Sequence, residues 1–355
     1  GAHNNRGDDD RAEAHDCADT KSDPAGIVER RLASASRGRR AFSRDTANFP
    51  RHFQRMASPA SSPLPRVRLL ATGGTIAGAQ VGGSRGYHAA VLSVDALVAA
   101  VPQVAELAQL DVEPVAAVGS QDMSDTIWLQ LATRARAAAD DPAIDGIAIT
   151  HGTDTMEETA YFLNLVVRTE KPIVLVGAMR PATAISADGP MNLYNAIAVA
   201  AHPDARRRGV LVVANDEIHL AREVTKTNTT QVGTFRSSHR GLAGLVNAGR
   251  PHFYAPPVRR HTSTSEFSSA AFTALPRVDI VYAHAGMRRE LIDAAVATGA
   301  RGLVIAGVGD GNLHRDALAA AIEAARKGVA IVRSSRTGGG VVERNIEIDD
   351  DAHGF

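Results

Sequence analysis

The sequence predicts an α/β protein with a larger N-terminal domain, built on a parallel sheet with crossover helices, and a smaller C-terminal α/β domain. Short apolar runs alternate with stretches of helical periodicity, the pattern of parallel strands joined by helices. The alternation lapses over residues 255–276, which are rich in Pro, Ser and Thr, and then resumes. At 355 residues the chain is long enough for two domains with separate cores. We therefore expect domains over residues 66–254 and 277–355, with a connection over 255–276.

The individual elements are predicted in chain order from the apolar pattern. The expected strands of the larger domain are 67–71, 144–150, 172–177 and 209–214, and its expected helices are 92–101, 124–139 and 191–201. Ser-Asp-Thr at the start of 124–139 is good N-capping chemistry. The expected strands of the smaller domain are 278–283, 301–306 and 328–332, and its expected helices are 289–298 and 315–326.

The first 65 residues differ in composition from the remainder. Acidic residues crowd the start, an Arg-rich stretch runs over 30–55, and a Ser/Pro tail follows. Segregated charge with few apolar residues cannot bury enough surface to offset the entropy of ordering. We expect residues 1–65 to be disordered or a spurious extension, with a basic interaction arm as the functional alternative.

Charge and cysteine content exclude several classes of function. Lys and Arg number 39, as do Asp and Glu, so no overall basic charge indicates nucleic acid or an anionic membrane as a partner. No apolar run approaches the eighteen or so residues of a membrane-spanning helix. A single cysteine excludes an internal disulfide and a thiolate metal cage, and the histidines lack metal-binding spacing. We expect a soluble protein without a structural zinc site.

Hydroxyl-bearing residues follow two of the predicted strands. Residues 71–78 (ATGGTIAG) form a Gly-rich turn with two threonines, and 151–155 (HGTDT) follow the strand 144–150. Ligands of parallel sheets bind beyond the carboxyl ends of the strands. Neither dinucleotide nor P-loop fingerprints fit 71–78, so a nucleotide site is not expected. For 71–78 alone, a tight turn with solvated hydroxyls is the simpler interpretation.

Lys226 stands out because only four of the 39 basic residues are lysines. It lies in the hydroxyl-rich tract 225–230 (TKTNTT). A lysine held beside an acid and a threonine could take the hydroxyl proton if its pKa were depressed. A third polar stretch, 119–123 (GSQDM), follows another apolar run. His151, by contrast, is interpreted as a buried structural histidine.

Together and in this order, the motifs resemble those of one family. ATGGTIAG, VGSQDMSD, ITHGTDTMEETAYFL, VGAMRPATAISADGPMNLYNA and TKTNTT are similar to the motifs of bacterial L-asparaginases of the two-domain, Thr-dependent type. The resemblance runs from about Val67 to Phe355. It implies hydrolysis of the side-chain amide of L-asparagine to L-aspartate and ammonia, without cofactor or metal. Glutaminase-asparaginase activity of broad amide specificity is the alternative, because one methylene is worth only about 1–3 kcal/mol in a pocket.

The resemblance implies specific catalytic roles. Thr75 matches the nucleophile that forms an acyl-enzyme, and Tyr87 matches a tyrosine that closes over the substrate from a mobile loop, here 79–90. Thr153, Asp154 and Lys226 match a second triad, in which lysine and aspartate support threonine. Which threonine acts first stays open.

The resemblance also implies substrate-binding roles. Gly119, Ser120 and Gln121 match the stretch that binds the α-carboxylate and α-ammonium of the substrate, and Asp154 pairs with the ammonium too. Glu347 matches an acid that reaches in from a neighbouring subunit. This implies a homotetramer built from intimate dimers.

Two departures from the family pattern bear on these expectations. The family continues some forty residues past the equivalent of Phe355, so we expect the second domain to be incomplete. The alternative to an enzyme is therefore a truncated, non-catalytic chain that binds amino acid or partner subunits without turnover. An Asn found in many relatives is absent from 282–286 (YAHAG).

We expect a cytoplasmic location, or a periplasmic one if a leader has been removed.

Overall fold

The computed structural model describes residues 63–80, 87–88, 94–254, 256–270 and 272–355. Residues 1–62 of the predicted N-terminal extension, and parts of the predicted loop 79–90, lie outside the described residues. Every strand and helix range predicted above matches an observed element, with each end within about three residues.

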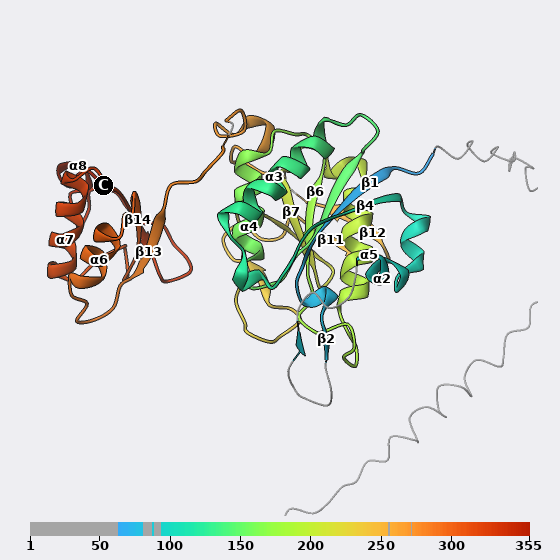
Figure 1. Cartoon of the computed structure of the whole chain (residues 1–355), viewed down its shortest axis with the longest axis horizontal. Coiled ribbons are helices and arrows are strands. Elements are labelled where there is room, and N and C mark those ends of the chain that lie inside the picture. The colour runs from blue at the N-terminus through green and yellow to red at the C-terminus, as the bar shows by residue number, and fades with distance from the viewer. Residues whose placement is uncertain (1–62, 81–86, 89–93, 255, 271) are drawn as a thin grey trace, which may run out of the picture. The chain divides into compact units, whose positions relative to one another are not determined.

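The larger sheet, in the part of the chain that is described, has eight strands in the order β12-β11-β8-β7-β6-β5-β1-β4 (Figure 1). Its strands are β1 (Arg66–Gly73), β4 (Gln109–Val118), β5 (Gly146–Thr150), β6 (Ile173–Val176), β7 (Val210–Ala214), β8 (Glu217–Leu220), β11 (Gly244–Asn247) and β12 (Arg250–Phe253). Strands β4, β1, β5, β6 and β7 are mutually parallel. The predicted parallel sheet is confirmed for β1, β5, β6 and β7, and β4 is a further parallel strand that the sequence analysis did not list.

The other three strands extend the sheet in antiparallel fashion, which the sequence analysis did not predict. Asn215 and Asp216 join β7 to β8, and both have positive φ, 53° and 62°. Ala248 and Gly249 join β11 to β12 with φ of 49° and 72°. A two-residue turn with both φ values positive reverses the chain into a hairpin, so no crossover helix is needed.

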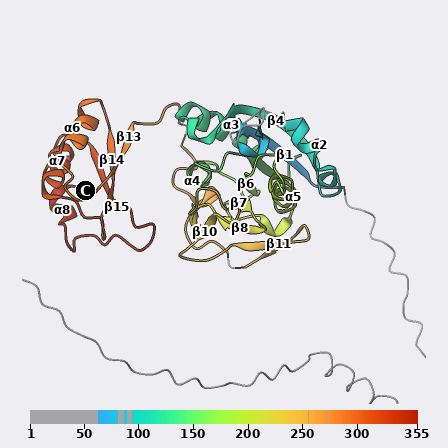
Figure 2. The same ribbon diagram turned by 90° about the horizontal axis from the view of Figure 1, so that it is seen from below.

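Helices cover both faces of the larger sheet (Figures 1 and 2). One core contains Leu97 of α2 (Val94–Ala99) and Leu193 of α5 (Gly189–Ala200), and the other contains Leu131 of α3 (Asp125–Asp140) and Leu163 of α4 (Met156–Val166). Alternate residues of β5, β6 and β7 belong to opposite cores. Burial on both faces explains why β5, β6 and β7 are continuous apolar runs.

Short elements connect these layers. They are η1 (Thr75–Ala77), η2 (Pro102–Glu106), η3 (Ser120–Asp122), η4 (Pro203–Ala205), η5 (Thr262–Thr264), the pair β2 (Ala79–Gln80) and β3 (Tyr87–His88), and the pair β9 (Val224–Lys226) and β10 (Phe235–Ser237). As predicted, Ser124 caps α3, and its Oγ accepts a hydrogen bond from Ile127 N at 3.4 Å. Within the described ranges, no helix is both long and apolar enough to cross a lipid bilayer.

The C-terminal region contains a second, smaller sheet. Its described strands are parallel, in the order β13 (Val278–Tyr282), β14 (Gly302–Gly307), β15 (Ala330–Ser335), and its helices are α6 (Glu290–Ala297), α7 (Arg315–Arg326) and α8 (Asp350–His353). Apolar residues of α6 and α7 pack with the strands in one core. Arg333 forms a buried, two-point ion pair with Asp350, with N–O distances of 2.5 and 2.8 Å. This pair attaches the start of α8 to β15.

Candidate active site

Three turns meet at the carboxyl ends of the adjacent parallel strands β4, β1 and β5. A Cβ added to Gly74, after β1, would lie 2.3 Å from the backbone nitrogen of Gly152, after β5. A Cβ added to Gly152 would lie 2.6 Å from Oγ of Ser120, after β4. A real Cβ does not approach other atoms so closely, so a larger residue at either position would force its neighbours to move. Because β1 lies between β4 and β5, these three turns share one edge of the sheet.

Thr75 begins η1 directly after β1. Gly73 and Gly74 precede it with φ of 102° and 84°, a conformation that strains other residues. The pair of glycines therefore allows a sharp departure from the strand. Thr75 is buried, with 6% of its surface exposed, inside the edge formed by the three turns.

Thr153, Asp154 and Lys226 form a hydrogen-bonded group. The Lys226 ammonium nitrogen Nζ donates to Thr153 Oγ1 at 2.9 Å and to Asp154 Oδ1 at 2.6 Å. Thr153 is buried, the Lys226 side chain is 14% exposed, and the Asp154 carboxylate is largely exposed. The structure therefore brings together the three residues predicted as a triad, although β9 is more than seventy residues from the 153–154 turn in sequence.

Ser120 links the turn after β4 to the turn after β5. Its buried Oγ accepts the Asp154 N–H at 3.0 Å, and its carbonyl accepts the Thr155 hydroxyl at 2.7 Å. Gln121 is exposed, and its side chain folds back to within 2.4 Å of where a Cβ on Gly119 would lie. Ser120, Gln121 and Gly119 thus border the same edge as Thr75, Thr153 and Asp154.

Glu157 is a contributor that the sequence analysis did not single out. It lies in the first turn of α4, and its Oε2 accepts the backbone N–H of Lys226 at 2.5 Å. Burial raises the pKa of the Glu157 carboxyl above its usual value, and the N–H of Lys226 partly opposes this effect. The sequence pattern gave no signal for this contact, because its two partners are 69 residues apart in the chain.

His151 lies in a buried hydrogen-bond chain. Trp128 Nε1 donates to Thr159 Oγ1 at 2.8 Å, the Thr159 hydroxyl lies 2.8 Å from His151 Nε2, and His151 Nδ1 lies 2.7 Å from the Gly152 carbonyl. A carbonyl only accepts, so Nδ1 carries the proton and Nε2 accepts from Thr159. Burial lowers the pKa of His151 to about 4, which keeps the ring neutral. This arrangement agrees with the prediction of a structural histidine.

The structure does not join the two remaining predicted residues to this group. Tyr87 lies in β3, opposite Gln80 of β2, and its side chain is outside the described residues. Glu347 lies in the C-terminal region, where it is exposed and its carboxylate accepts a hydrogen bond from the Asn312 amide. The roles predicted for Tyr87 and Glu347 stay predictions.

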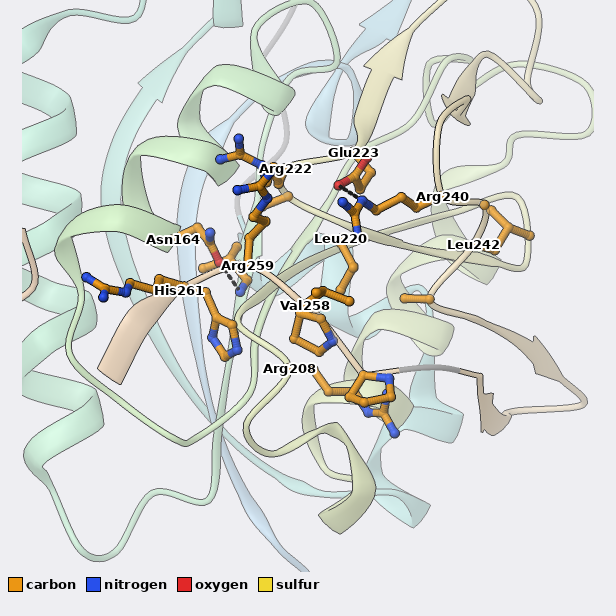
Figure 3. Close-up of a pocket in the computed structure, with 17 residues that line it drawn as sticks. Asn164, Arg208, Leu220, Arg222, Glu223, Arg240, Leu242, Val258, Arg259 and His261 are labelled. Atoms are coloured by element: carbon orange, nitrogen blue, oxygen red, sulfur yellow. Dashed lines mark hydrogen bonds and ion pairs between the residues drawn. The ribbon is translucent and has the colours of Figure 1, made fainter. Parts of the chain in front are cut away.

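A cavity of about 300 Å³ lies elsewhere on the larger domain (Figure 3). It is lined by the start of β7, the end of β8 and residues 256–261, so it lies at the amino ends of the parallel strands. None of the predicted site residues lines it. Among the residues that the structure describes, no group of three or more His, Cys, Asp and Glu side chains could hold a metal ion.

Comparison with known proteins identifies the class of protein that this fold and site define. Residues 66–259 match the family described as "Asparaginase, N-terminal", and residues 277–355 match the "Glutaminase/Asparaginase C-terminal domain". The chain belongs to this two-domain asparaginase/glutaminase family.

Three relatives illustrate the similarity. The chain is 48% identical to "L-asparaginase 2" of Bacillus subtilis (strain 168) over 82% of this chain and 79% of the relative. It is 46% identical to "L-asparaginase 2" of Escherichia coli (strain K12) over 84% of this chain and 85% of the relative. It is 42% identical to "Glutaminase-asparaginase" of Pseudomonas fluorescens biotype A over 86% of this chain and 85% of the relative.

Proposed function

We propose that this protein is an L-asparaginase, an amidohydrolase that converts L-asparagine and water to L-aspartate and ammonia without metal or cofactor. The observation that carries the proposal is the contact of Lys226 Nζ with both Thr153 Oγ1 and Asp154 Oδ1, beside the buried Thr75 turn. Family membership and the names of the relatives support the same activity. In this proposal, the domain over 66–254 carries nearly all the chemistry.

In the first chemical step, Thr75 is the nucleophile. Its hydroxyl oxygen attacks the side-chain amide carbon, its proton passes to a base, and the C–N bond breaks as ammonia leaves with an added proton. The product is an ester between Thr75 and the aspartyl group. Backbone N–H groups of the glycine-lined turns are suited to stabilise the oxyanion that develops, because they are held rigidly at the sheet edge.

Water then hydrolyses the ester and releases L-aspartate. Lys226 Nζ lies 2.9 Å from Thr153 Oγ1, so the two atoms are placed for transfer of the hydroxyl proton. The adjacent Asp154 carboxylate stabilises the ammonium that results. Tyr87 is assigned to help activate Thr75 when its loop closes over the substrate.

Substrate recognition is assigned to the same edge of the sheet. A zwitterionic amino acid needs an acid for its ammonium group and donors for its carboxylate. The exposed Asp154 carboxylate is the acid for the ammonium group, and residues 119–121 supply the donors for the carboxylate. Glu347 is proposed to complete the site from a neighbouring subunit, in a homotetramer built from intimate dimers. The cytoplasmic location stays a prediction from sequence.

Ammonia release by the purified protein from L-asparagine and, separately, L-glutamine tests the proposal. We expect turnover of asparagine, with kcat reduced about 10²–10⁴-fold in Thr75→Ala and in Thr153→Ala. Mass spectrometry of the quenched reaction should find the acyl group on the peptide that contains Thr75. A folded protein that releases ammonia from neither amide would overturn the proposal and favour the chain that binds without turnover.

The same assay decides the substrate range. Relatives named L-asparaginase and relatives named glutaminase-asparaginase have similar identities to this chain. Comparable kcat/KM for both amides would assign the broad-specificity alternative. A preference for asparagine of tenfold or more, about 1.4 kcal/mol, would assign the narrower activity.

A further inference from the structure

Glu157 provides a link between the two segments that form the proposed triad. It lies three residues after Asp154, at the start of α4, so the same turn carries Thr153, Asp154 and Glu157. Its Oε2 is 2.5 Å from the backbone nitrogen of Lys226. Lys226 is therefore held at two points, by its backbone through Glu157 and by its side chain through Thr153 and Asp154.

The backbone of Lys226 requires such an anchor. Lys226 is the last residue of β9, a three-residue strand whose described pairing is with β10, where Lys226 lies opposite Phe235. The N–H of Lys226 donates to Glu157, and the next residue, Thr227, donates its N–H to the Thr234 carbonyl. A strand this short is weakly specified by its own ladder, so an additional hydrogen bond from α4 determines where its end lies.

The position of this backbone matters because the lysine side chain is long. Four methylene groups separate Cα from Nζ, and fixing them has an entropy cost. Nζ must contact two oxygen atoms at once, at 2.9 and 2.6 Å. Displacing a catalytic group by about 1 Å can lower the rate about 10²-fold.

The environment of Glu157 is consistent with such a role. Glu157 is partly buried and adjacent to Glu158, and both effects raise its pKa, whereas the N–H and the charge of Lys226 lower it. Burying a carboxyl beside another acid is unfavourable unless specific hydrogen bonds compensate. Glu158, the neighbouring residue, is exposed on the same helical turn.

We propose that Glu157 is a positioning residue: its carboxylate holds the backbone of Lys226 so that Nζ stays between Thr153 and Asp154. This inference rests on the proposed function, because it assigns Lys226 to the reaction. Glu157 acts through Lys226 and does not contact the substrate.

The test compares steady-state ammonia release by Glu157→Ala, Glu157→Gln and the matched control Glu158→Ala. We expect Glu157→Ala to lower kcat about 10–100-fold with KM changed less than about threefold, because proton transfer is impaired while substrate contacts remain. Glutamine retains an oxygen that accepts the Lys226 N–H, so Glu157→Gln should recover kcat to within about threefold of the wild type. Glu158→Ala should match the wild type.

A double-mutant cycle that combines Glu157→Ala with Lys226→Ala, followed by kcat, distinguishes a positioning role from a general effect on folding. If Glu157 acts through Lys226, adding Glu157→Ala to Lys226→Ala should lower kcat no further. Should Glu157→Ala fail to fold, Glu157→Asp withdraws the acceptor by one methylene while keeping the charge, and it should be slower than Glu157→Gln.

The possible results separate the two proposals. If the wild type is active but Glu157→Ala behaves like Glu158→Ala, or Glu157→Gln is as slow as Glu157→Ala, the positioning role is wrong. Additive losses in the cycle with Lys226→Ala would also overturn it. If the folded wild type releases no ammonia from either amide, the proposed function itself fails.

Discussion

Lowering the pH should destabilise the larger domain through His151. Burial holds the pKa of His151 at about 4 in the folded protein, below the usual histidine value of 6.5. Because the folded-state pKa is lowered, the associated stability is present above about pH 6.5 and is lost as pH falls toward 4. At about pH 5, the unfolded chain binds nearly one proton at this residue that the folded protein does not. The corresponding loss in the free energy of unfolding between about pH 7.5 and 5 is about 2 kcal/mol.

His151→Asn is the variant that isolates this effect. The asparagine amide can replace the Nδ1–H that donates to the Gly152 carbonyl, but it takes up no proton in this range. It loses the hydrogen bond from Thr159, so at about pH 7.5 the variant should be about 1 kcal/mol less stable than the wild type. Because the variant avoids the loss of about 2 kcal/mol that the wild type suffers between about pH 7.5 and 5, it should be about 1 kcal/mol more stable than the wild type at about pH 5.

Trp128 makes the measurement specific to the larger domain. It is the single tryptophan of the chain, it lies in α3, and it donates to Thr159 beside His151. Urea unfolding followed by Trp128 fluorescence at the two pH values gives the free energy of unfolding in each case. The wild type should lose about 2 kcal/mol more than His151→Asn between the two pH values. An equal loss in both proteins would refute the conclusion that His151 is held neutral by burial.

Three further predictions concern other parts of the structure. Gly152→Ala places a Cβ 2.6 Å from Ser120 Oγ. It should lower the free energy of unfolding in urea by about 1–3 kcal/mol and raise KM for asparagine. An unchanged KM would contradict the assigned role of Ser120. Asp350→Asn breaks a buried pair with Arg333, which holds the pKa of Asp350 at about 2, and should destabilise the C-terminal region by about 3–5 kcal/mol at neutral pH. That penalty should shrink in thermal melts as pH falls from the usual aspartate range toward 2, and a penalty independent of pH would argue against the pair. Dialysis against a chelator should leave ammonia release unchanged, and a loss that zinc or magnesium restores would show that a metal takes part.

Much of the candidate site was predictable from the sequence, because its residues are concentrated at strand ends. Thr75 and Thr153 follow apolar runs that the alternating pattern predicts as buried strands, and parallel strands end at a common edge. The contact between Lys226 and Asp154 could not be derived from strand periodicity, because β9 belongs to a separate two-stranded sheet. Only the motif resemblance indicated that these residues act together.

The sequence by itself determined the strands and helices listed in the sequence analysis, because apolar periodicity and capping residues are local properties of the chain. It did not predict β8, β11 and β12, because their hairpin turns at 215–216 and 248–249 depend on positive φ values that the residue types there do not require. Nor did it reveal the roles of Glu157 and Thr159, whose partners Lys226, His151 and Trp128 come from other turns, strands and helices. A hydrogen bond between residues distant in sequence exists only once packing has brought their elements together, so these contacts were decided by the tertiary structure.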